Sequence, residues 1–94
     1  MEYYFPQPIF PFPSEDHILE KGEHSPLVYI LQSVLHELSA DYVTPKAPAM
    51  TGTYDEATVQ SVQHWQQVVG LPTNGVVDRF IWDMLAELYN ARLT

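Results

Sequence analysis

An internal repeat in the second half of the chain constrains its fold more than any other feature. Residues 51–55 (TGTYD) align without a gap with residues 74–78 (NGVVD), and the register continues into apolar positions at helical spacing. Each copy joins a small polar residue, a glycine and an aspartate, which is typical of a tight turn leading into a capped helix. The repeat therefore predicts a turn–helix unit that occurs twice.

A first helix is expected ahead of the repeat. Ser25 is a favoured N-cap and Pro26 fits the first helical position, so the helix should cover residues 26–39. Its apolar residues recur at helical spacing and form a face broad enough to be buried on more than one side. These residues are Leu27, Val28, Ile30, Leu31, Val34, Leu35 and Leu38.

The two repeat copies predict a second helix over residues 55–69 and a third over residues 79–91. Asp55 and Asp78 are the expected N-caps, and a capping box that starts at Thr53 is the rival for the second helix. Inward positions include Trp65 and Trp82, which we assign to the core rather than to exposed sugar-stacking platforms. Gly70, followed by Leu71 and Pro72, should end the second helix in a left-handed conformation. Short extended pairing is compatible with the residues around Tyr54 and Val77. The predicted fold class is all-α: a small three-helix bundle built on a turn–helix pseudo-repeat.

The N-terminal region has a different character. Residues 1–21 are expected to form an extended Pro/aromatic arm and a polar connector, and residues 22–94 the helical domain. Prolines within residues 1–13 exclude both helix and central strand. The aromatic side chains of this arm either cover part of the core or form a proline-rich ligand or sugar-stacking strip. We favour the first interpretation, because so much exposed aromatic surface promotes aggregation.

Composition excludes several classes of function. With 94 residues the chain has room for one domain, and its net charge of -8 repels nucleic acid and anionic lipid. No apolar run approaches the roughly 20 residues that a membrane span needs. The absence of cysteine excludes disulfides and Cys-based zinc sites. Glu2 and the early prolines do not fit a signal peptide, so a cytoplasmic location stays open.

No catalytic, metal or cofactor site is expected. The chain has no nucleophile, metalloprotease or phosphate-loop motif, and no two of its histidines stand at i, i+4. The acid pairs Glu15-Asp16 and Asp55-Glu56 are assigned to the connector and to a helix start rather than to glycosidase chemistry. The histidines are His17, His24, His36 and His64.

Residues 22–89 resemble the peptidoglycan-binding domain-1 family. The motifs that carry the resemblance are Leu31-Gln32, Gly52-x-Tyr54-x-x-x-Thr58, Val62-x-x-Trp65-Gln66-x-x-x-Gly70-Leu71, Gly75-x-Val77 and Trp82-x-x-Leu85. The resemblance implies a three-helix bundle that anchors a cell-wall hydrolase, transpeptidase or carboxypeptidase without catalysis of its own. The chain departs from the family at its turns. Thr51 and Asn74 replace aspartates, and Asp55 and Asp78 replace glycines.

The resemblance places a ligand site at the two glycine turns, where shallow polar pockets would hydrogen-bond the peptide stem. Tyr54 is expected to be half-buried with its hydroxyl outward, and to supply an apolar contact. Arg79 either meets a stem-peptide carboxylate or offsets Asp78 and Asp83 on its own helix. Gln66 either binds the ligand or, as we favour, locks a turn backbone. The candidate site residues are Thr51, Gly52, Tyr54, Gln66, Asn74, Gly75 and Arg79.

The function expected from this resemblance is non-catalytic binding of peptidoglycan or its stem peptides, in the cell wall or outside the cell, as part of a larger protein with a fused or partner wall enzyme. The alternative is a protein–protein interaction or structural module on the same scaffold, in a phage, spore or secretion assembly. The acidic balance and the aromatic arm favour this alternative.

Overall fold

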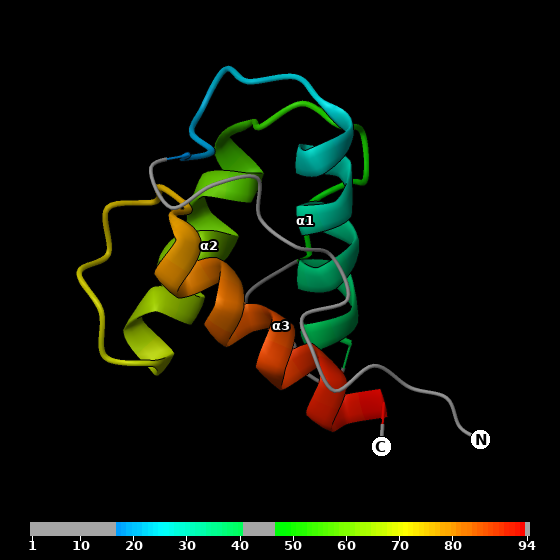
Figure 1. Cartoon of the computed structure of the whole chain (residues 1–94). Coiled ribbons are helices and arrows are strands. Elements are labelled where there is room, and N and C mark those ends of the chain that lie inside the picture. Colours follow the sequence, from blue (N-terminus) through cyan, green and yellow to red (C-terminus); the bar gives the residue numbers. More distant parts are fainter. Residues whose placement is uncertain (1–16, 41–46, 94) are drawn as a thin grey trace.

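The computed structural model describes residues 17–40 and 47–93, and these residues form three helices. Helix α1 covers Pro26–Leu38, α2 covers Glu56–Val68 and α3 covers Arg79–Leu93. Figure 1 shows α3 crossing the bundle obliquely, from the side of α2 toward the C-terminal end of α1. The all-α three-helix prediction is confirmed, with helix ends that differ by one or two residues. The aromatic arm and the pair Glu15-Asp16 lie outside the described residues.

The three helices start in the same way. The side chains of Ser25, Asp55 and Asp78 each accept a hydrogen bond from the backbone N–H three residues further on, at 3.3, 3.0 and 3.0 Å respectively. Each bond satisfies one of the donors that a helix start leaves unpaired. The predicted caps are therefore confirmed, and the rival capping box at Thr53 is wrong.

Gly70 ends α2 as predicted. Its φ of +83° lies in the left-handed region, where a residue with a Cβ is strained. The Leu71 N–H donates to the Gln66 carbonyl at 2.8 Å, and the Gly70 N–H donates to the Gln67 carbonyl at 3.1 Å. This pair of bonds is a Schellman motif, which satisfies carbonyls at the helix end.

The core lies where the three helices meet. Trp65 and Trp82 are buried in it, as predicted. Leu19 is also fully buried, although it lies in the segment that we expected to be a polar connector. Backbone hydrogen bonds between Leu19 and Val77, at 2.8 and 2.9 Å, hold this segment against the second turn. The other buried apolar residues are Val28, Leu31, Val34, Leu35, Leu38, Pro48, Tyr54, Val62, Val77, Ile81, Leu85 and Ala86.

Candidate functional site: two clamped glycine turns

A buried glutamine of α1 clamps the first turn. The Gln32 side chain is fully buried, and its Oε1 accepts hydrogen bonds from the backbone N–H groups of Thr51 and Gly52, both at 2.8 Å. Its Nε2 donates to the Thr53 carbonyl at 2.9 Å and to the Thr58 hydroxyl at 3.0 Å. All the hydrogen-bonding groups of one amide are therefore used, with three bonds to the first turn and one to Thr58 of α2.

A buried glutamine of α2 clamps the second turn in the same manner. The Oε1 of Gln66 accepts from the Gly75 N–H at 2.9 Å. Its Nε2 donates to the Asn74 Oδ1 at 2.9 Å and to the Val76 carbonyl at 3.0 Å. The turn-locking interpretation of Gln66 is confirmed. Because the side chain is only 3% exposed, its amide groups are committed to the protein itself.

The polar residues that open the two turns have equivalent roles. The Thr51 Oγ1 accepts from the Thr53 N–H at 3.1 Å, and the Asn74 Oδ1 accepts from the Val76 N–H at 2.9 Å. Such bonds from a side chain to the backbone two residues on stabilise tight turns. A hydroxyl oxygen in the first turn and an amide oxygen in the second thus supply equivalent uncharged acceptors. Both residues are exposed.

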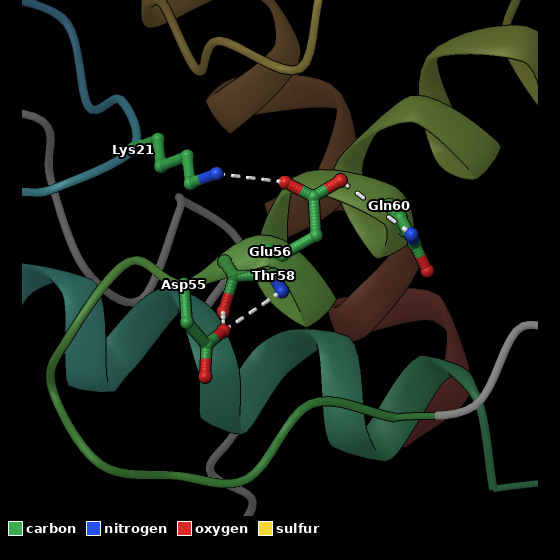
Figure 2. A network of polar contacts seen from close by, with 5 residues as sticks. All are labelled: Lys21, Asp55, Glu56, Thr58 and Gln60. Atoms are coloured by element: carbon green, nitrogen blue, oxygen red, sulfur yellow. Dashed lines mark hydrogen bonds and ion pairs between the residues drawn. The ribbon is translucent and has the colours of Figure 1, made fainter.

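The first clamp continues into the cap of α2. The Thr58 hydroxyl accepts from Gln32 and donates to the Asp55 Oδ1 at 2.8 Å. This hydrogen bond, together with the bond from the Thr58 N–H, lowers the pKa of the Asp55 carboxyl. Figure 2 shows this cap beside Lys21, whose Nζ lies 3.0 Å from the Glu56 Oε1. The turn and the helix start therefore form one polar network.

Tyr54 corrects the sequence prediction. Its ring is 1% exposed, and its hydroxyl donates to the Gly75 carbonyl at 2.6 Å. Burial is the main cause that raises the pKa of this hydroxyl, with the charges of Glu23 and Glu20 adding to it. The expected half-exposed ring is wrong because the side chain reaches inward across the repeat and ties the first turn to the second.

The remaining predicted site residues differ in exposure, because the two turn glycines are buried and Arg79 is exposed. The glycines adopt positive φ, +84° at Gly52 and +76° at Gly75, and both are buried by their neighbours. Arg79 is exposed at the start of α3, where its Nε lies 3.3 Å from the Asp83 Oδ2. The interpretation that Arg79 offsets an acid of its own helix is supported by this ion pair.

Two residues beside the first turn were missed by the sequence analysis. Tyr29 is 47% exposed, and its Cβ lies 3.9 Å from the position that a Cβ on Gly52 would take. His24 is exposed as well, with its Nδ1 2.7 Å from the Thr53 Oγ1. The sequence does place Tyr29 three residues before Gln32, on the same face of α1, and this spacing could have indicated that Tyr29 lies beside the first glycine turn.

Outside the two turns, the described structure has a cavity but no cluster of metal-ligating side chains and no membrane-spanning helix. Within residues 17–40 and 47–93, no three His, Asp or Glu side chains gather to hold a metal ion. None of the helices described is long and apolar enough to cross a membrane. A cavity of about 330 Å³ opens near the C-terminal ends of α1 and α3, and none of the predicted site residues lines it. Its lining residues are Leu38, Trp65, Leu88, Ala91 and Arg92.

Comparison with known proteins agrees with this geometry. The sequence profile of a family described as a peptidoglycan binding domain matches residues 24–85. The fold is similar to a crystal structure of a peptidoglycan-binding protein from Clostridioides difficile in complex with glutamine hydroxamate, with a TM-score of 0.70 at 22% sequence identity. The similarity covers 86% of this chain and 48% of that protein, so this chain spans about half of its length. No curated protein sequence matches the chain significantly.

Proposed function

Because the chain belongs to the peptidoglycan binding domain family, we propose that it binds peptidoglycan without cleaving it and holds an attached enzyme or assembly at the bacterial cell wall. The observation that carries this proposal is the pair of clamped turns within the matched residues. Buried Gln32 and Gln66 fix these turns from inside, so that exposed polar groups such as Thr51 and Asn74 are held in place before any ligand arrives. Preorganisation of this kind reduces the entropic cost of binding.

The charge of the chain restricts how it binds. At a net charge of -8, the protein gains no long-range attraction to an anionic wall polymer. The contacts must then be hydrogen bonds and apolar packing, which salt screens weakly. Weak binding at each single site is sufficient to hold the protein on the wall, because a repetitive polymer presents many sites close together.

Co-sedimentation with purified sacculi tests the proposal. We expect the folded protein, at tens of micromolar, to pellet with sacculi to a similar extent at low and at physiological salt. An unrelated acidic domain of similar size and charge is the matched control and should stay in the supernatant. The turbidity of the sacculus suspension should stay constant over hours, because no catalysis is proposed.

Each alternative function has its own outcome in this experiment. Clearing of the suspension would contradict the non-catalytic role. If the folded protein stays wholly in the supernatant, wall binding is refuted and the scaffold is assigned to protein–protein interaction instead. Attachment is tested separately in cells: a fluorescent protein exported with this domain should outline the wall, and the same fluorescent protein without it should not.

A further inference from the structure

The outward faces of the two turns differ, although their inner clamps are equivalent. Beside Gly52 the neighbouring helix presents Tyr29, whose side chain is 47% exposed. Beside Gly75 the neighbouring helix presents Val59, which is half-buried, and Gln63, whose Nε2 donates to the Thr73 carbonyl at 3.2 Å. An exposed tyrosine therefore lies beside the first turn. The side chains that border the second turn are a half-buried valine and an amide that is bonded to the protein itself.

From this asymmetry we infer that the first turn carries the ligand site, and that it takes the uncharged sugar rings of the glycan strand rather than the acidic stem peptide. The inference rests on the proposed function and assigns to it a surface and a ligand class. We refer to the exposed side chains of this region as the Tyr29 surface. It comprises His24, Tyr29, Met50, Thr51 and Thr53.

The backbone beneath the Tyr29 surface is fixed on both sides. The Ser25 N–H donates to the Gly52 carbonyl at 3.0 Å, and the Tyr54 N–H donates to the Glu23 carbonyl at 2.8 Å. These bonds pair the segment before α1 with the first turn, while the amide of Gln32 holds the same turn from below. The ring and the polar groups are therefore presented on a rigid support, as a preorganised site requires.

The chemistry of the Tyr29 surface suits a neutral sugar. None of its five residues is an acid, a lysine or an arginine, although the whole chain carries a net charge of -8. An exposed tyrosine ring offers an apolar face to the C–H groups of a pyranose, and its hydroxyl offers a hydrogen bond. The His24 Nδ1 and the Thr53 Oγ1 are bonded to each other at 2.7 Å, and the other ring nitrogen of His24 and the second lone pair of the hydroxyl match sugar hydroxyl and acetamido groups. A stem-peptide carboxylate would find no lysine or arginine among these five residues, and the net charge of the domain opposes its approach.

A pair of aromatic substitutions tests the location of the site. We expect Tyr29→Ala to weaken sacculus binding about tenfold, because the stacking face is lost, and Tyr29→Phe to retain most of the binding. Phe80→Ala is the matched control, since Phe80 is an aromatic residue of α3 that is 59% exposed. It should bind like the wild type. Circular dichroism should show that all three variants remain folded. Wild-type retention with unchanged retention of Tyr29→Ala would refute the site while leaving the proposed function intact.

The ligand class is tested with separated wall components. The sugar probe is a neutral oligosaccharide of N-acetylglucosamine, because glycan strands released by an amidase carry a free lactyl carboxylate on every second sugar. Stem peptides released by the amidase are the second probe, and each is added to ¹⁵N-labelled protein. We expect the neutral oligosaccharide to shift the amide signals of residues 22–25 and 51–53, and the stem peptides to leave them unchanged. Shifts of these signals by the stem peptides alone would overturn the assignment to sugar. Absence of wild-type binding to intact sacculi would instead refute the proposed function itself.

Discussion

Removal of the Gln32 side chain should be among the most damaging polar substitutions in this protein. Its amide makes four hydrogen bonds, of 2.8 to 3.0 Å, to the first turn and to Thr58. In Gln32→Ala the Gly52 N–H loses its partner in a buried position, and Thr58 keeps only its bond to Asp55. The Thr51 N–H and the Thr53 carbonyl are partly buried, so water can replace the amide there.

The size of the loss follows from these groups. A buried donor or acceptor left without a partner costs about 1–3 kcal/mol, and the removed side-chain atoms leave a cavity that adds to this cost. The unpaired Gly52 N–H, the weakened bonding of the Thr58 hydroxyl and the cavity together give an expected loss of about 3–4 kcal/mol in the free energy of unfolding. A small domain has about 5–15 kcal/mol in total, so the variant should remain folded but be much less stable.

Urea unfolding followed by tryptophan fluorescence measures this loss, because Trp65 and Trp82 are both buried and change environment on unfolding. Gln32→Met keeps most of the side-chain volume and removes the hydrogen bonds, so it separates the polar contribution from the cavity. The exposed Gln67→Ala is the matched control, with an expected change below about 0.5 kcal/mol. The clamp argument fails if Gln32→Met loses less than about 1 kcal/mol, since volume rather than hydrogen bonding would then explain the role of Gln32.

Three further predictions concern the same network. In equilibrium unfolding, Gly75→Ala should lose several-fold more stability than Gly22→Ala. A Cβ on Gly75 would lie 2.8 Å from the Val59 Cγ1, whereas a Cβ on Gly22 would have no atom within 4 Å. Both glycines have positive φ, so equal losses of stability would contradict the packing argument. Tyr54→Phe removes a buried hydrogen bond and should cost about 1–2 kcal/mol near neutral pH. Since the pKa of Tyr54 is higher in the folded state than in the unfolded state, wild-type stability should fall as the pH rises above the ordinary tyrosine pKa of about 10. An equally steep fall in Tyr54→Phe would show that ionisation of Tyr54 is not the cause. The pKa of Asp55 is lowered by folding, so the stability that its carboxylate contributes should be present above its ordinary pKa of about 4, and be lost as the pH falls below that value. Asp55→Ala should cost about 1 kcal/mol of stability at neutral pH. A stability difference from wild type that does not shrink in acid would count against the cap.

Local signals in the sequence were enough to predict the helices. The caps Ser25, Asp55 and Asp78 act on a backbone N–H three residues away, and Gly70 acts on its own φ and on the adjacent helix end. Such effects depend on residues that are close in the sequence, so pattern and propensity reveal them. The membership of the family could be predicted for the same reason, because its motifs lie within these helices and turns.

The misassigned residues depend on contacts between distant segments. Leu19 is apolar in a polar segment, and only its pairing with Val77 brings it into the core. Tyr54 stands next to a turn, where an aromatic ring is compatible with exposure, but its hydroxyl finds the Gly75 carbonyl across the repeat. Tyr29 lies outside the main apolar stripe of α1, and its position beside Gly52 depends on how the loop returns to the helix. None of these three outcomes follows from helical periodicity.

The structure also changes what the repeat unit is. In the sequence the unit is a turn followed by a helix, whereas the hydrogen bonds define a helix whose buried glutamine clamps the turn that follows. Gln32 pairs with Gly52 and Gln66 pairs with Gly75, across connections of different length, so a single gapless alignment cannot include both the clamp and the turn. The clamp fixes the inside of each turn in the same way. The outside is left to vary independently of the fold, which is why the first turn can have the exposed Tyr29 beside it while the second has the half-buried Val59 and the bonded amide of Gln63.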